Sequence, residues 1–151
     1  MRKTSDNPAA YISEKWKDIY QKLCRGEGSL FNHMTGLFTL CASIGYLNDQ
    51  KSPLEKRKDI FKWTSLNPDT EIPVLTAIAW GAKERDLSLL SDRKIILKNA
   101  GEFAEAGMAY LHEQFFEDYW QEGPLIPPDK SDLAFHLAQS IEELRRNQSV
   151  I

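Results

Sequence analysis

The sequence predicts a single, mainly α-helical domain of about five helices, with room for one short β-hairpin. Its 151 residues match the usual length of one domain. Apolar residues recur every three or four positions in several segments, which is the period of an α-helix with one buried face. Prolines and glycines separate these segments. We therefore expect one domain over residues 1–151, with 1–7 and 147–151 as flexible tails.

The first predicted helix begins at Asp6-Asn7-Pro8, because a polar residue before a proline is a typical helix start. It is expected to end near Gly26. Its apolar positions follow helical spacing and are Tyr11, Ile12, Trp16, Ile19, Tyr20 and Leu23.

The second predicted helix begins near Ser29 and ends at Gly45 or Asn48. It is apolar nearly all round, so we expect it at the centre of the fold. Its wide apolar stripe consists of Leu30, Phe31, Met34, Leu37, Phe38, Cys41 and Ile44.

The segment 60–66, IFKWTSL, is short, aromatic and β-branched, which favours a strand or an extended arm. A single strand cannot form a sheet, so a partner strand has to come from elsewhere. The candidate within the chain is 94–97, KIIL. That run also fits a helix, and a helical 94–97 would favour a helix at 60–66 too.

The third predicted helix follows two proline signals, at 67–69 and at Ile72-Pro73. Its small residues, Ala77, Ala79, Gly81 and Ala82, allow close packing against another helix.

The fourth predicted helix is the longest: it is capped by Ser91-Asp92 and runs to Trp120. Gly101 and Gly107 each disfavour the helix by about 1 kcal/mol relative to alanine, so they indicate a break or a crossing. The proline-rich segment 122–129 ends this helix, and a last amphipathic helix is expected over 131–146.

The composition is typical of a soluble globular protein, with 42% apolar and 27% charged residues and a formal charge of −3. That net charge disfavours a protein that coats nucleic acid generally. The first ten residues lack the apolar core of a signal peptide, and no run is long enough to span a membrane. We expect a cytoplasmic protein with reduced thiols and no membrane contact.

The thiol and imidazole groups give a weak signal for catalysis. His33 and Cys41 are eight residues apart, about 12 Å along a helix, which is too far for a base to activate a thiol. Cys41 lies in the most apolar stripe, where a thiol is inert. His112, Glu113 and Glu117 resemble part of a metal site, but a solvated acidic helix end explains them better. We expect no catalytic residue, no metal and no cofactor.

A basic segment suggests contact with nucleic acid. Five cations fall within twelve residues, and Phe61 and Trp63 lie among or beside them. The cations are Lys51, Lys56, Arg57, Lys58 and Lys62. Acidic residues in the same segment reduce its net charge, so a solvated turn is the competing interpretation.

Aromatic residues beyond the needs of a small core suggest contacts with a protein partner. The candidate partner-binding residues are Phe61, Trp63, Phe116, Tyr119 and Trp120, together with the segment 124–128. Packing in the core is an equally good explanation for each aromatic side chain.

Three segments, 36–63, 71–93 and 102–115, carry a family resemblance. Their shared features are the apolar helix ending in Gly45-Tyr46, the turn from Lys51 to Pro53, the pair Phe61 and Trp63, and the alanine-rich helix that leads to Asp92. Together these segments resemble small bacterial proteins associated with DNA phosphorothioation (Dnd) systems. The resemblance implies an accessory component of a bacterial antiphage or DNA-modification-linked defence locus. A small middle subunit of a multi-component defence ATPase complex is a related interpretation.

The leading hypothesis for function is a non-catalytic accessory subunit that bridges an ATPase, nuclease or DNA-sensing subunit of such a complex. The alternatives are a DNA- or RNA-binding protein that uses Lys51 to Lys62 and, ranked third, a small metal-dependent nuclease. The expected partners are larger subunits of the complex. Direct contact with DNA and oligomerisation stay open.

Overall fold

The computed structural model describes residues 7–24, 31, 33–82 and 91–116, together with 138–139, 142–143 and 146. The expected tails, apart from Asn7, lie outside these residues. So do the two ends expected for helices, at Gly26 and at Trp120, and most of the helix expected over 131–146.

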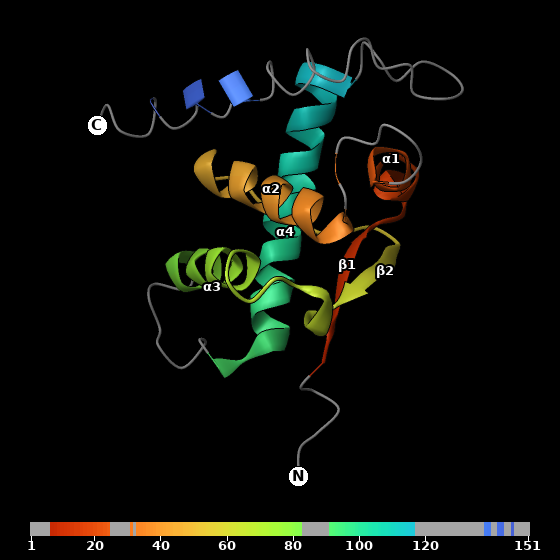
Figure 1. Ribbon diagram of the computed structural model, residues 1–151. Helices are drawn as coiled ribbons and strands as arrows, with labels where there is room; N and C mark the ends of the chain where they lie inside the picture. The colour runs from red at the N-terminus through yellow and green to blue at the C-terminus, as the bar shows by residue number, and fades with distance from the viewer. Residues whose placement is uncertain are drawn as a thin grey trace.

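The described part of the chain is mainly α-helical, with one two-stranded antiparallel sheet, which confirms the predicted fold class. Helix α4 (Arg93–Leu111) runs through the middle of the molecule, and α2 (Met34–Leu47) crosses it (Figure 1). Helix α3 (Glu71–Ala82) lies on one side of α4, and the sheet lies on the other side. Helix α1 (Glu14–Cys24) packs beside the sheet and α2.

The sheet joins β1 (Ala9–Ser13) to β2 (Arg57–Lys62), which are separated in the chain by α1 and α2. The prediction of a helix from residue 8 onward was wrong over these five residues. Pairing with β2 satisfies the backbone groups of 9–13 and buries Ala10 and Ile12, so tertiary contact overrides the local helical pattern. The helix itself begins at Glu14, and there the predicted spacing of Ile19, Tyr20 and Leu23 is correct.

The prediction of a strand at 60–66 was right for its first three residues, which end β2; Trp63–Ser65 form a short 3-10 turn, η2. The partner proposed for it, 94–97, is instead helical. Asp92 caps α4 by accepting a hydrogen bond from the Ile95 N–H at 3.1 Å, and Ile96 and Leu97 face the core. A helical 94–97 therefore does not make 60–66 helical, because β1 supplies the partner that was missing.

The crossing of α2 and α4 is unusually close because each helix contributes a glycine. A Cβ atom on Gly107 would overlap the backbone carbonyl of Cys41, and one on Gly45 would overlap that of Phe103. Gly107 thus marks a crossing, one of the two predicted alternatives, and α4 continues through both glycines without a break. Gly45 lies inside α2, which ends at Leu47 with Asn48 as its C-cap residue.

The core forms around this crossing. Leu37, Phe38, Cys41 and Ile44 of α2 are all buried, which confirms the central position predicted for this helix. Other fully or nearly fully buried residues come from β1, α1, α3 and α4 and include Ile12, Tyr20, Leu75, Ile96, Met108 and Leu111. Beyond Leu111 the chain forms a π-helical turn, η4 (His112–Phe116). No helix within the described residues is long and apolar enough to span a membrane.

Alanine at position 107 should destabilise the protein strongly, although alanine is a better helix former than glycine. The new methyl group meets backbone, which cannot rotate away as a side chain can, so we expect a loss of about 1–3 kcal/mol in the free energy of unfolding. Urea denaturation of Gly107→Ala measures this loss.

Gly36→Ala is the matched control for that substitution. Gly36 lies in α2, the other helix of the crossing, but the nearest atom to its Cβ position is a Glu71 carboxylate oxygen at 3.8 Å, an ordinary contact distance. This variant should be as stable as the parent or more stable, because it gains helix propensity without a clash. Equal effects of the two substitutions would contradict the close crossing.

Candidate functional site

The basic segment from Lys51 to Lys62 is divided among different parts of the surface. Lys58 Nζ lies 3.4 Å from a carboxylate oxygen of Glu14, and Lys51 Nζ lies 5.7 Å from the centre of the Phe103 ring. The Arg57 guanidinium lies 4.5 Å from the centre of the Tyr11 ring. These cations therefore have separate neighbours on α1, α4 and β1.

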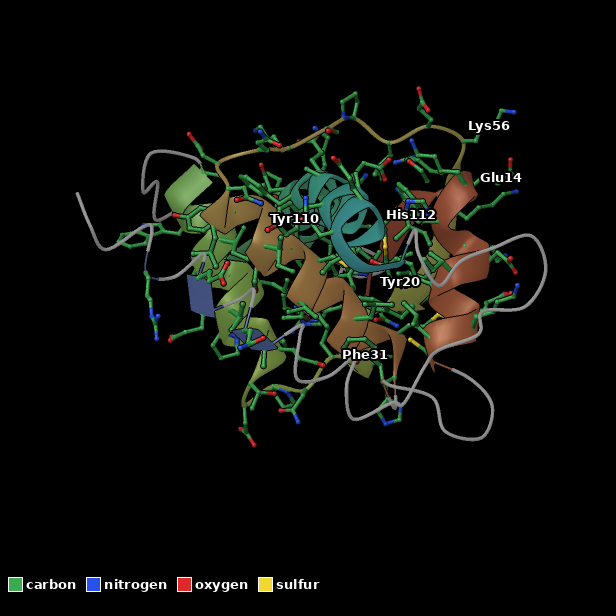
Figure 2. The ribbon with its side chains drawn as sticks, turned by 90° about the horizontal axis from the view of Figure 1, so that it is seen from above. Glu14, Tyr20, Phe31, Lys56, Tyr110 and His112 are labelled. Carbon is green, nitrogen blue, oxygen red and sulfur yellow. The ribbon has the colours of Figure 1, made fainter. Side chains whose placement is uncertain are left out.

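The other two cations, Lys56 and Lys62, are solvent-exposed, as are Lys51 and Arg57. Lys56 adopts a left-handed backbone conformation with φ of 53° at the turn before β2. It lies near Glu14, Lys15 and Glu55 at the N-terminal end of α1 (Figure 2). The carboxylates of Glu14 and Glu55 reduce the positive potential there. Lys62 ends β2 opposite Ala9.

Arg57 shares a pocket with two cations that sequence reasoning missed. Lys94 and Lys98 lie on the exposed side of α4 and line a cavity of about 300 Å³ together with Arg57. Lys94 belongs to the run that was weighed as a strand, and Lys98 follows it directly. Their spacing of four residues, which places both side chains on one face of a helix, was the available signal.

The two candidate partner-binding aromatics that can be described lie against the core. Trp63 is only 6% exposed, and the Arg93 guanidinium lies 5.2 Å from the centre of its ring. Phe61 is half-buried and meets Phe38 edge to face, with ring centres 5.2 Å apart. For Trp63 this burial favours packing over contact with a partner.

The remaining candidate partner-binding residues cannot be placed. The side chain of Phe116, the residues Tyr119 and Trp120, and the segment 124–128 lie outside the described part of the molecule.

His33 and Cys41 occupy different environments. Cys41 is fully buried, as predicted, and burial raises the pKa of its thiol from 9.0 to about 12, with the neighbouring Tyr20 hydroxyl offsetting part of the rise. His33 is exposed at the N-cap position of α2, where its side chain makes no capping hydrogen bond.

His112 packs with its ring centre 5.5 Å from that of Trp16, on the α1 side of the end of α4 (Figure 2). Its suggested companion Glu117 lies outside the described residues. Within the described residues, no three His, Cys, Asp or Glu side chains are grouped so that they could hold a metal ion.

Several polar atoms are buried between α1 and α4 without a hydrogen-bond partner among the described residues. They are the Trp16 Nε1, the Tyr20 hydroxyl oxygen and one carboxylate oxygen of Glu105. The other Glu105 oxygen lies 3.9 Å from the Nζ of Lys15. The neighbouring Cys41 thiol is only a weak hydrogen-bonding group. It therefore replaces only part of the hydrogen bonding with water that the Tyr20 hydroxyl loses on folding.

An apolar groove runs between the C-terminal half of α2 and α3, with a volume of about 500 Å³. Tyr46 and Val74 flank it and are the large apolar side chains with the greatest exposure in the described structure, 40% and 39%. All described residues that line the groove are uncharged. Besides Tyr46 and Val74 they are Ser43, Leu47, Ala77, Ile78, Trp80 and Gly81. An apolar surface of this kind on a folded domain is typical of a binding site.

Sequence reasoning did not single out this groove. The small residues of the third predicted helix, Ala77 among them, were expected to pack against another helix, and an exposed apolar face was not predicted. The signal was available, because α3 carries no charged residue after Glu71. A helix without a polar face is normally covered on all sides.

A scan against protein-family models, a search of curated proteins and a search of solved structures each found no match.

The free energy of unfolding should fall as the pH rises above 9. Burial raises the pKa of both Cys41 and Tyr20, so the folded chain keeps two protons that the unfolded chain releases in this range. Stability is then lost with rising pH, because the unfolded state binds fewer protons than the folded state. Urea denaturation at a series of pH values from 7 to about 11 measures the slope.

The double variant Tyr20→Phe and Cys41→Ala removes both groups and should show a shallower slope over the same pH range. All other side chains are the same in the two proteins, so the comparison isolates the contribution of Tyr20 and Cys41. An identical slope in parent and variant would show that neither group is linked to folding.

Proposed function

We propose that this protein is a non-catalytic accessory subunit of a bacterial antiphage or DNA-modification-linked defence complex, in which it bridges an ATPase, nuclease or DNA-sensing subunit. The observation that carries the proposal is the uncharged groove between α2 and α3. The resemblance of three segments to Dnd-associated proteins supplies the kind of complex.

The groove has the composition of the centre of a protein interface. Such centres are depleted in charge and rich in aromatic and aliphatic surface, and Tyr46, Val74 and Trp80 provide that surface here. The adjoining surface, which shares Tyr46 and Gly81 with the groove, carries Asp49 and Lys51. An apolar centre beside a charged rim is the arrangement found in protein–protein interfaces.

The occupant we propose is an apolar helix face of a larger subunit. A charged segment would lose its hydration in the groove without gaining a partner, and this is costly. Ser43 and Ala77 are small, so they leave room for the side chains of an incoming helix, whereas the Tyr46 ring lies over Gly81. Apolar grooves between helices are a common site for binding an amphipathic helix.

Charge introduced into the groove should disrupt the complex without unfolding the subunit. Ala77→Asp adds a carboxylate at an exposed position of α3, and we expect at least a tenfold loss of affinity for a purified large subunit of the complex. Ala109→Asp is the matched control, since Ala109 is an exposed alanine on α4 away from the groove. Circular dichroism and thermal melting check that both variants fold.

The large subunit is first identified by affinity capture from the native host with nuclease treatment, and the complex is then rebuilt from purified proteins. Recovery of an ATPase, nuclease or DNA-sensing subunit whose binding depends on Ala77 and not on Ala109 supports the proposal. Equal binding by both variants, or self-association through the groove in sedimentation, contradicts it.

Nucleic-acid binding through the basic segment stays a second candidate function, supported by the solvent exposure of Lys56 and Lys62 in that segment. The five predicted cations do not share one surface, so we expect weak binding with a strong dependence on salt.

Fluorescence anisotropy with a DNA duplex that carries 5′-hydroxyl ends tests this second candidate. Replacing Lys56 and Lys62 with Glu should reduce the affinity for the duplex. The slope of the logarithm of the binding constant against the logarithm of the salt concentration should become shallower by roughly one for each phosphate that the variant no longer binds. Binding that is insensitive to salt, or to these substitutions, would remove the basic segment as a nucleic-acid interface.

A further inference from the structure

The pocket that contains Arg57 combines an apolar floor with a cationic rim. It lies between β1, the turn that leads into β2, and the exposed side of α4. Ala9, Leu54 and Leu97 contribute its apolar surface, and the Tyr11 ring forms part of a wall. Its volume of about 300 Å³ is at the lower end of the range for small-molecule sites. The pocket therefore suits a compact ligand and not a folded partner.

The rim carries more positive charge than its own neighbours neutralise. No carboxylate of the described residues lies within 4 Å of the charged nitrogen atoms of Arg57, Lys94 or Lys98, while the described salt bridges involve Lys15, Lys22 and Lys58. Two lysines four residues apart on a helix repel each other. An anion between them would remove this repulsion.

The Arg57 guanidinium stacks on the Tyr11 ring, which holds it in place. The distance from the guanidinium carbon to the ring centre is 4.5 Å. Stacking of this kind orients the planar guanidinium and leaves its N–H groups free to bind a phosphate with two hydrogen bonds. The pair also offers a flat surface on which another ring can stack.

Glu102 is the one acidic residue among the described residues that line the pocket. It lies four residues beyond Lys98 and eight beyond Lys94 on the same face of α4, about 6 Å and 12 Å along the helix axis. The wall formed by α4 thus has a cationic end and an acidic end, and the acidic end can accept hydrogen bonds from amino or hydroxyl groups. With three cations and one carboxylate, the site matches the charge of a phosphate monoester, which is about −1.5 to −2 at pH 7.

We propose that this pocket binds a small phosphorylated ligand with a planar ring, of the size of a mononucleotide. The phosphate binds to Arg57, Lys94 and Lys98, and the ring lies on the apolar floor beside Tyr11. The same chemistry is present in a free nucleotide and in the 5′-phosphorylated end of a nucleic-acid strand. The inference does not depend on the groove between α2 and α3.

Isothermal titration calorimetry of the full chain with the four nucleoside 5′-monophosphates tests the proposal. We expect at least one of them to bind tenfold or more tightly than its nucleoside and than inorganic phosphate, because the ring and the phosphate contact different parts of the pocket. No binding at millimolar concentration, or equal affinity for inorganic phosphate, would overturn it.

Two variants and a control locate the binding. Lys94→Gln combined with Lys98→Gln should weaken the nucleotide at least tenfold, and Ala9→Leu should weaken it by filling the floor. Lys17→Gln, a matched loss of an exposed lysine on α1 that does not line the pocket, should leave the affinity unchanged. Binding that survives the double substitution would place the ligand elsewhere and overturn the assignment.

The source of the phosphate is distinguished by comparing the mononucleotide with a short single strand in 5′-phosphorylated and 5′-hydroxyl forms. Binding of the phosphorylated strand at the affinity of the nucleotide or better identifies a strand end, and binding of the nucleotide alone identifies a free ligand. Equal binding of the two strand forms, with no nucleotide binding, contradicts a terminal-phosphate site.

Discussion

The close contact between the backbones of α2 and α4 is the constraint on which the rest of the structure depends. Gly45 and Gly107 each leave space for the backbone of the opposite helix, at Phe103 and at Cys41. Interiors pack as densely as crystals of small molecules, so a separation forced by one methyl group would loosen every side chain around the crossing. The two glycines weaken their own helices and make this packing possible.

Both candidate surfaces result from what packs onto α4 around that crossing. Helix α3 lies on one side of α4 and β1 on the other (Figure 1). Where α3 meets the end of α2, an uncharged groove remains beside Tyr46 and Val74; where β1 meets the exposed lysines of α4, a pocket with a cationic rim remains. The first surface suits an apolar helix of a protein, and the second suits a small anion. One small domain thus offers two surfaces with opposite chemistry.

The sequence was sufficient to locate three of the helices, but it did not predict the strand β1 or the contacts between the elements. Periodicity located α2, α3 and α4, and the Asp92 cap was predicted correctly. The strand β1 was missed because its partner is more than 40 residues away, and a local pattern carries no information about such pairing. The same limit explains the pocket: Arg57 was recognised within a basic segment, but Lys94 and Lys98 join it only through the fold. Trp63 was ambiguous because an aromatic residue suits a core and an interface equally well.

The most direct test of the central proposal is photo-crosslinking from the groove in the native host. The photoreactive residue p-benzoylphenylalanine replaces Val74 in one strain and Ala109 in another, and crosslinked products are identified by mass spectrometry. The proposal predicts a crosslink from position 74 to one larger subunit of a defence complex, and no such product from position 109. If position 74 gives no crosslink, or gives the same products as position 109, the result contradicts a docking role for the groove.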